Sequence, residues 1–523
     1  MIREHNAPEG EIIFMTTLRK NAAANFLGRV WGAISIYIFV PLYLRFLGIE
    51  AYGMVGFYSI LLGIFLLADM GLSATLNREM ARLSVRGDTA HEVGDSVRTY
   101  EFAYLFVSLA VASTIWFLAP FFAERWLNTN SLSLNEMITA IRLMGIAVAF
   151  QLPSGLYFGG LLGLQKQVLA NSVQVGWGIM RGVGGVLILW LISPTIIAFS
   201  LWQLISNATY CYSIRRALWR KLPFTPSKPR VNWLLWRGTW KYSLGMASIT
   251  VLSTILMQTD KLVVSKILTL EAFGYYSLAG SLAMAPIILA SSIGLAVFPR
   301  MTGFVSLGDL NSLSYLYHKA CSLISLAVIP GAMTLVIFSG DFILAWTGSA
   351  SAVKNAAVVA QFLLGGQLLQ AITVVPFYLA LAHGQTRIIL ITQIAMVLII
   401  IPLLIHLIEN YGSVGGGISW FVVNLIILPF YMLSLHRRFM PGELRAWALR
   451  DIGRPLIVAA PIILMSHLLL PLPSSRILMI CQIITIWFVS VLATVISISN
   501  LRADLGNMLK NLFLHSTLRK VML

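Results

Sequence analysis

Five charged residues lie inside long apolar stretches of this sequence: Arg29, Asp69, Arg142, Arg181 and Asp260. A charge at the bilayer centre costs about 2.5 to 3.5 kcal/mol, so such residues normally face a protein interior or a water-filled cavity. Arginine binds phosphate oxygens with its planar fork, whereas a buried carboxylate can neutralise an arginine or exchange a proton. Together these residues predict a charged cavity within a bundle of membrane helices.

Two of the arginines belong to polar stripes with helical spacing. The first stripe is Asn21, Asn25, Arg29, Gly32 and Ser35, and the second is Asn171, Gln174, Gly178, Arg181 and Gly185. We expect Asn25, Asn171 and Gln174 to line the cavity beside the arginines. The alternative is that the amides join helices, while each arginine pairs locally or reaches the bilayer surface. Both interpretations stay open for Arg142, which lies nearer the predicted outer surface.

The sign of the charges indicates the kind of ligand. All three arginines fall in the first half of the chain, where Asp69 is the one buried acid expected. The resulting positive charge favours an anionic ligand, because a low-dielectric wall strengthens the attraction. Asp69 either neutralises Arg29 or exchanges a proton. Asp260 is a second candidate for ion or proton coupling, and its neighbour Lys261 does not face it, since adjacent helical residues point in different directions.

Composition places the chain among integral membrane proteins. Of its 523 residues, 58% are hydrophobic and 11% are charged, against about 25% charged in soluble proteins. A membrane helix needs about 20 apolar residues. We therefore predict an all-α polytopic fold with 14 spans, at 21–46, 51–77, 99–122, 137–160, 168–190, 193–214, 242–268, 272–298, 316–340, 355–381, 388–407, 413–436, 453–470 and 477–499.

The distribution of basic residues supports these spans. Of the 37 lysines and arginines, 28 fall on one side, six on the other and three inside spans. Cytoplasmic loops carry such an excess, so both termini are expected in the cytoplasm. The net charge of +17 is therefore topological and does not indicate nucleic-acid binding. The first 20 residues lack the layout of a signal peptide, and Met15 is an alternative start to Met1.

The chain carries an internal repeat. LGIEAYG at Leu47 recurs as LTLEAFG at Leu268, an offset of 221, and GLQKQ at Gly163 resembles HGQTR at His383. Six predicted spans separate the copies, so they have parallel topology, as in many transporters; chance similarity is the alternative. The predicted organisation is an N-terminal segment, a six-helix bundle, a basic linker, a second six-helix bundle, two further helices and a cytoplasmic tail, at 1–20, 21–218, 219–241, 242–438, 439–500 and 501–523.

Motifs for chemistry are lacking. The sequence has no Walker A, D-x-D or H-E-x-x-H motif, so neither nucleotide hydrolysis nor metal-dependent glycosyl transfer has a visible site. Its three cysteines are far apart in apolar runs, which indicates core packing and no metal. Gly155, Gly159 and Gly163 form a G-x-x-x-G ladder for close helix packing. We expect a transporter, with no enzymatic activity and no cofactor.

Three segments of the first half carry a family resemblance. NAAANFLGRV at Asn21, VPLYLRFLGIEAYG at Val40 and LADMGLSATLNREMARL at Leu67 resemble the polysaccharide-transporter branch of the multidrug/oligosaccharidyl-lipid/polysaccharide exporter superfamily, in particular Wzx-type O-antigen flippases. The second half agrees through QTDKLVVSKILTLEAFGYYSLAG at Gln258 and YGSVGGGIS at Tyr411. The resemblance covers nearly the whole chain. It rests on the order of motifs that are individually degenerate.

This resemblance implies two six-helix bundles, here with two added helices, that work by alternating access in the bacterial inner membrane. The implied substrate is an undecaprenyl-diphosphate-linked oligosaccharide, flipped from the inner to the outer leaflet. Polymerase or assembly proteins are implied partners. The diphosphate would be held by Arg29 and Arg181, with Arg142 as a further candidate. Gln258 joins the polar residues of the cavity, and Asp69 and Asp260 would couple transport to an ion or proton gradient.

Two other functions compete with this one. A multidrug cation antiporter of the same superfamily is expected to have a more acidic cavity. A membrane glycan polymerase or ligase would need a catalytic outer loop, and the predicted outer loops are short, such as PLPSS at Pro471.

Overall fold

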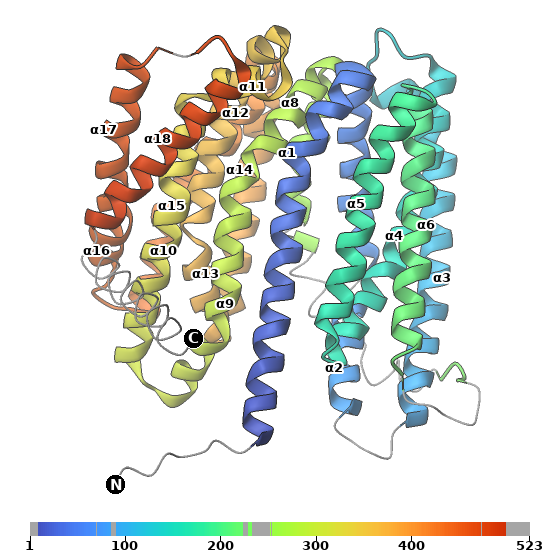
Figure 1. Ribbon diagram of the computed structural model, residues 1–523, viewed down its shortest axis with the longest axis horizontal. Coiled ribbons are helices and arrows are strands. Elements are labelled where there is room, and N and C mark those ends of the chain that lie inside the picture. Colours follow the sequence, from blue (N-terminus) through green and yellow to red (C-terminus); the bar gives the residue numbers. More distant parts are fainter. Residues whose placement is uncertain are drawn as a thin grey trace, which may run out of the picture. The chain divides into compact units, whose positions relative to one another are not determined.

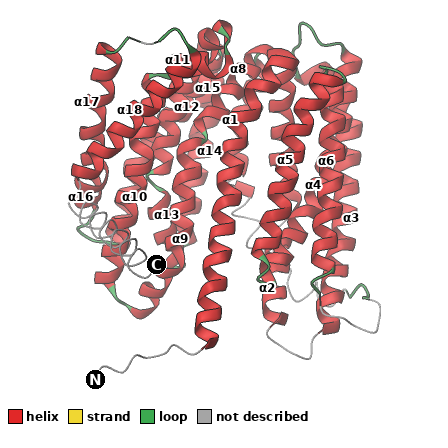
Figure 2. Cartoon of the chain, viewed as in Figure 1, coloured by secondary structure: helices red, strands yellow, loops and turns green. Residues whose placement is uncertain are grey.

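The computed structural model describes residues 9–69, 71–84, 90–222, 229–232, 251–252, 254–471 and 473–497. These residues are almost entirely helical (Figures 1 and 2), and one isolated β-bridge joins Asn128 to Thr269. The chain divides into two compact units, Met1–Ser277 and Leu278–Leu523. The predicted all-α fold class is confirmed.

The first unit is a bundle centred on α4. It contains α1 (Glu9–Phe65), the 3-10 turn η1 (Leu66–Asp69), α2 (Leu72–Ser84), α3 (Ala90–Phe121), the π-turn η2 (Phe122–Trp126), α4 (Leu134–Gly163), α5 (Gln167–Leu191), α6 (Ile196–Trp219), a helix over 254–267 and most of α8 (Leu270–Ala283). Helix α4 packs against α2, α3 and α6, and α5 packs against α1 and α6 (Figure 1).

The second unit is built around α10. It contains α9 (Ala285–Leu307), α10 (Leu310–Ile337), α11 (Ser339–Thr347), α12 (Ala350–Ala371), α13 (Val374–Ala382), α14 (Thr386–Tyr411), α15 (Ser413–Phe439), α16 (Leu444–Ala446), the π-turn η3 (Trp447–Gly453), α17 (Arg454–Leu469) and α18 (Arg476–Ser497). Helix α10 contacts α9, α12, α17, α18 and η3. The predicted bundle boundaries stay a prediction. Residues 254–267 belong to the first unit, where the Gln258 side chain packs on Gly63 of α1.

Eleven helical segments of the described residues are long and apolar enough to cross a membrane. The first, Val30–Asp69, has 40 residues, about 60 Å at 1.5 Å per residue, or twice a hydrocarbon core. Gly48 interrupts it with φ 76°. Helix α6 is not among the eleven, and the predicted span 242–268 lies partly outside the described residues. The number 14 therefore stays a prediction.

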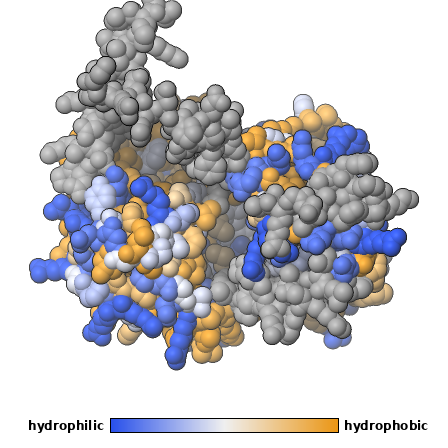
Figure 3. Space-filling model, turned by 90° about the horizontal axis from the view of Figure 1, so that it is seen from below, coloured by the Kyte–Doolittle hydropathy of each residue, from blue (hydrophilic) through white to orange (hydrophobic). Residues whose placement is uncertain are grey.

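The surface of the helices fits a lipid environment. Leu105, Leu109 and Phe117 of α3 are 62%, 63% and 79% exposed, an apolar face that water would disfavour. Figure 3 views the helices from the end at the bottom of Figure 1, and there hydrophilic side chains gather. The chain is a multi-pass membrane protein.

The glycine ladder of α4 packs against α2. A Cβ at Gly159 would lie 2.7 Å from the carbonyl oxygen of Ser73, and one at Gly163 would lie 2.4 Å from that of Asn77. Only glycine permits this approach of two backbones. The predicted packing role of the ladder is confirmed.

The two copies of the Glu-Ala-aromatic-Gly motif contact each other within the first unit. A Cβ at Gly53 would lie 2.4 Å from the carbonyl oxygen of Leu270, and one at Gly274 would lie 2.3 Å from that of Ile49. Gly274 lies 221 positions after Gly53, and Leu270 lies 221 positions after Ile49, which is the offset of the sequence repeat. The contact is therefore reciprocal, as a local twofold axis would make it.

The second pair of repeat segments forms the same turn. After α4, the Lys166 N–H donates to Leu161 O at 2.9 Å, and after α13 the Gln385 N–H donates to Ala380 O at 3.0 Å. The residue before each donor has a left-handed backbone, with φ 58° at Gln165 and 67° at Gly384. Gln165 thus occupies a position that favours glycine.

Gln165→Gly should stabilise the protein by about 0.5 to 1 kcal/mol, because a side chain in the left-handed region costs about 1 to 2 kcal/mol and glycine loses part of that gain through backbone entropy. Gly384→Gln, at the equivalent turn, should destabilise it. The apparent melting temperature in detergent measures both. A lower melting temperature for Gln165→Gly would contradict the backbone argument.

Candidate functional site

Arg181 lies where α5 meets α6. Its guanidinium carbon is 4.6 Å from the ring centroid of Trp177, one turn earlier on α5. Trp177 in turn stacks on Tyr210 of α6, with ring centroids 4.5 Å apart and planes inclined by 17°. A guanidinium over an indole face is attracted by the ring quadrupole. The two rings therefore orient the arginine.

The same arginine also faces α1. The exposed side of α5 carries Ile179, Val183 and Leu187, and helical geometry directs Arg181 to the opposite side. There Phe39 of α1 packs against Gly182, and the Tyr43 hydroxyl of α1 donates to Gly182 O at 3.3 Å. The Arg181 charge acts electrostatically on the hydroxyls of Tyr43 and Tyr58. Arg181 therefore lies among α1, α5 and α6.

Arg181 has no acidic partner in the described part of the chain. The ion pairs found there involve other residues, and the described contact of the Arg181 guanidinium is the Trp177 ring. An arginine held by neutral groups in a bundle interior keeps its full charge and its fork of donors. This arrangement can bind an anion.

Part of the predicted stripe on α5 faces α1. The Asn171 side-chain oxygen would lie 2.6 Å from a Cβ at Gly28, and Gly178 lies against Trp31. Arg29 stands between these two contacts along α1, but its side chain and that of Asn25 are outside the described residues. Gln174 lies half-buried on α5. The cavity itself stays a prediction.

Arg142 is not brought to Arg181. Its guanidinium carbon lies 4.7 Å from the ring centroid of Trp116 on α3, and Trp116 is 42% exposed. The Arg142 Nε is buried without a hydrogen-bond partner among the described residues. This arginine therefore shares no described contact with the Arg181 site.

Asp69 accepts hydrogen bonds at the start of α2. The Ser73 hydroxyl donates to it at 2.5 Å, the Ser73 N–H lies 3.4 Å away, and the Tyr104 hydroxyl of α3 also donates. A carboxylate that accepts from a backbone N–H of the first turn caps a helix start and satisfies one of its free N–H groups. The described partners of Asp69 are thus structural ones, whereas a pairing with Arg29 involves a side chain outside the described residues.

Asp260 is 8% exposed in the helix over 254–267. It accepts a hydrogen bond from the Tyr276 hydroxyl of α8 at 2.7 Å. No ion pair with Lys261 occurs among the described residues, as the helical geometry predicted. Gln258, two residues earlier, has its amide nitrogen against Gly63 and its amide oxygen buried without a described partner.

Sequence reasoning missed Glu101, which joins three helices of the first unit. It accepts hydrogen bonds from Arg215 at 2.8 Å, Trp219 at 2.7 Å and Tyr157 at 3.0 Å, and from Arg98 at 3.1 Å. Glu101 stands at the beginning of a predicted span, where an acid is ordinary. Its burial was the missing information, since no local pattern shows that α4 and α6 cover it.

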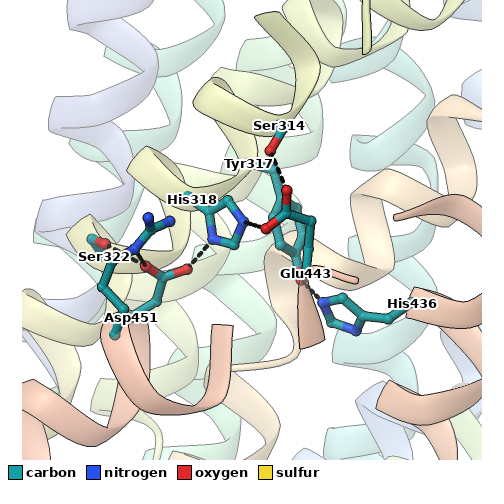
Figure 4. A network of polar contacts seen from close by, with 8 residues as sticks. Ser314, Tyr317, His318, Ser322, His436, Glu443 and Asp451 are labelled. Atoms are coloured by element: carbon teal, nitrogen blue, oxygen red, sulfur yellow. Dashed lines mark hydrogen bonds and ion pairs between the residues drawn. The ribbon is translucent and has the colours of Figure 1, made fainter. Parts of the chain in front are cut away.

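A second cluster, in the second unit, was also missed (Figure 4). The His318 Nδ1 contacts Asp451, and its Nε2 lies 3.1 Å from Glu443. Ser322 and Arg450 each donate to Asp451 at 3.1 Å. These residues belong to α10 and to the connection over 440–453, more than 120 positions apart, so sequence spacing carries no signal of their contact.

Comparison with known proteins identifies the family. Residues 18–305 match the family described as "Polysaccharide biosynthesis protein", and this match covers more than half of the chain. The chain belongs to that family. The resemblance to polysaccharide transporters of the multidrug/oligosaccharidyl-lipid/polysaccharide exporter superfamily is thereby confirmed.

Relatives and solved structures agree with this assignment. A "Putative O-antigen transporter" of Shigella flexneri is 23% identical over 77% of this chain and 93% of its own length. The "Uncharacterized membrane protein EpsK" of Bacillus subtilis is 22% identical over 76% of this chain and 80% of its own length.

The structures show a shared fold. Lipid II flippase MurJ in an inward closed conformation matches with a TM-score of 0.71 at 14% identity, covering 91% of this chain and 97% of its own. An inward-facing multidrug resistance MATE family transporter matches with a TM-score of 0.68 at 15% identity, covering 79% and 96%. The fold is therefore common to flippases and drug transporters and does not select between them.

Asp69→Ala should destabilise the protein by about 1 to 3 kcal/mol, because buried donors lose their acceptor, whereas Asp69→Asn retains an acceptor oxygen and should cost less. The melting temperature in detergent measures both changes. If Asp69→Ala melts like the unmodified protein, the capping role is wrong. If Asp69→Asn transports with an unchanged pH dependence, Asp69 does not exchange the coupling proton.

Proposed function

We propose that this protein is a flippase for an undecaprenyl-diphosphate-linked oligosaccharide, such as the repeat unit of O-antigen or a similar surface polysaccharide. It moves this lipid from the inner to the outer leaflet of the bacterial inner membrane by alternating access, with both termini in the cytoplasm. It does so without catalysing a reaction. The family, the O-antigen transporter relative and the flippase-like fold support this proposal.

The observation that carries the proposal is the acid-free environment of Arg181. A diphosphate presents several anionic oxygens, and an arginine fork binds two of them at once. The rings of Trp177 and Tyr210 orient the fork and provide an apolar wall. A carboxylate beside Arg181 would compete with the ligand, and among the described residues no such ion pair exists.

Tyr58 offers a second donor to the same anion. Asn207 of α6 donates its side-chain N–H to the Tyr58 hydroxyl oxygen at 2.9 Å, which leaves the hydroxyl hydrogen for another acceptor. Tyr58 is buried, and the Arg181 charge reaches its hydroxyl. A phosphate oxygen between the two residues would accept from both. Arg29, on the part of α1 that packs on α5, is the further arginine that we propose for the diphosphate.

A multidrug cation antiporter remains the competing function, because the fold is shared with such transporters. The charge of the site disfavours it, since an unpaired arginine repels a cationic drug. Efflux of fluorescent cations from cells that produce the protein tests this alternative directly.

We predict that Arg181→Gln lowers the flipping rate about tenfold or more, because charge-assisted hydrogen bonds contribute about 1.5 to 3 kcal/mol. Arg181→Lys should fall in between, as it keeps the charge but not the fork. The assay uses proteoliposomes with a fluorescent diphosphate-linked lipid oligosaccharide and an impermeant quencher that reports the outer leaflet.

The matched control is Arg142→Gln, which removes an intramembrane arginine stacked on Trp116 outside the Arg181 site. It should flip the substrate at nearly the unmodified rate. Equal loss in both variants would mean a general effect of arginine removal. Full activity of Arg181→Gln would exclude Arg181 from the site.

A further inference from the structure

The His318 cluster has more acceptors than a neutral imidazole can satisfy. Both ring nitrogens of His318 face carboxylates, Nδ1 toward Asp451 and Nε2 toward Glu443 at 3.1 Å (Figure 4). A neutral imidazole has one N–H, and its other nitrogen carries a lone pair that repels a carboxylate oxygen. The observed contacts therefore require one additional proton shared by His318, Asp451 and Glu443.

The surrounding charges are compatible with that proton. Arg450 of η3 donates to Asp451, and Ser322 of α10 donates to the same oxygen. With Asp451 and Glu443 ionised and His318 doubly protonated, two positive charges face two negative ones. This neutral arrangement is the one that burial favours, and Asp451 is fully buried.

Further ionisable groups lie beside the cluster, and the neighbouring Lys319 of α10 has its ammonium 5.6 Å from the centroid of the Tyr315 ring. His436 of α15 has its Nδ1 2.9 Å from Met432 O, so Nδ1 donates, and its Nε2 accepts from the Tyr317 hydroxyl at 3.1 Å. Cys321 and Tyr431 lie close by in the same core. The elements α9, α12, α13, α17 and α18 provide no hydrogen bond or ion pair to His318 among the described residues.

The proton strengthens the attachment of the connection over 440–453 to α10. Ser314 and Ser322 of α10 also support this attachment, donating to Glu443 at 3.2 Å and to Asp451 at 3.1 Å. Asp451 and its arginine are on η3, which leads directly into α17, and Glu443 is at the start of α16. The Glu443 side chain is 36% exposed, whereas that of Asp451 is fully buried. Loss of the proton to water therefore breaks the contact with Glu443 first. The core that contains Trp447 and Met440 then loses a polar anchor at its edge.

We propose that His318, Asp451 and Glu443 form a proton-binding site that attaches the 440–453 connection to α10 and couples protonation to transport. The site deepens the proposed function, on which the coupling part rests. When the site is occupied, His318 bridges the two carboxylates. When the proton has left to water, Glu443 separates from His318 and keeps its hydrogen bond from Ser314 of α10, so the connection is held more weakly and opens more often.

The first test is hydrogen exchange of the backbone amides of 440–453 in the full-length protein, corrected for the intrinsic pH dependence of exchange. Across a pH titration, protection should fall about tenfold toward high pH, because the charge-assisted contact is lost with the proton. The control His406→Gln replaces an exposed histidine of α14 and should keep the pH-dependent loss of protection. A pH-independent protection of the unmodified protein would overturn the proposal.

Two variants separate the proton site from a merely structural one. His318→Gln should make protection low at every pH. Glu443→Gln should make it high at every pH, because the new amide donates to the free nitrogen of a neutral His318 and no additional proton is needed. A protein that simply misfolds could not show opposite effects from the two changes. A retained pH step in Glu443→Gln would overturn the proton site.

The coupling part is tested in proteoliposomes with a pH gradient and the fluorescent diphosphate-linked lipid oligosaccharide. Unmodified protein should flip faster with the gradient than without it, and Glu443→Gln should lose this difference. If Glu443→Gln still responds fully to the gradient, the coupling is wrong. A pH step in hydrogen exchange without any flipping of the lipid would support the proton site and contradict the proposed function, so the two failures are distinguishable.

Discussion

The cost of a charge surrounded by hydrocarbon governs the polar architecture of this protein. Glu101 is surrounded by Arg98, Arg215, Tyr157 and Trp219, and Asp260 is held by Tyr276. Asp69 is bound by Ser73 and Tyr104. Each acid is satisfied by donors within its own unit, as low dielectric demands. Arg181 differs from these acids. Its charge faces the aromatic ring of Trp177, and it has no acidic partner among the described residues. That difference, more than its location, supports a role in binding an anion.

The predicted repeat segments share backbone features, whereas the side-chain contacts of the two halves differ. The turns at Gln165 and Gly384 share their hydrogen-bond pattern, and Gly53 and Gly274 make reciprocal contacts. In the first half, Glu101 of α3 binds Arg215 of α6. In the second half, Tyr317 of α10 binds His436 of α15, which lies 221 positions after Arg215. An ion pair between helices of the first half thus contrasts with a hydrogen bond between a tyrosine and a histidine in the second half. Under the proposed function, the first half binds the ligand and the second responds to the gradient.

The fold and part of the candidate site were predictable from the sequence because the bilayer restricts the possible structures. Only helices satisfy their backbone in hydrocarbon, so runs of about 20 apolar residues predict spans without tertiary information. Helical spacing predicted that Asn171 and Gly178 share one face of a helix, which the structure packs against α1, and the glycine ladder of α4 predicted close packing. Arg142 shows where this reasoning ends. Its residue type matches that of Arg181, yet its contact is the exposed Trp116.

The sequence by itself determined the membrane class, the family and the repeat, because hydrophobicity and motif order are properties of short segments. Tertiary structure decided which charges meet. Glu101 and Arg215 are 114 positions apart, and His318 and Asp451 are 133 positions apart. Their proximity follows from the packing of α3 on α4, α4 on α6 and α10 on η3. Whether a charged residue is a ligand site or a structural anchor depends on its partners. In a helical membrane protein those partners come from other helices, which no local pattern of residues specifies.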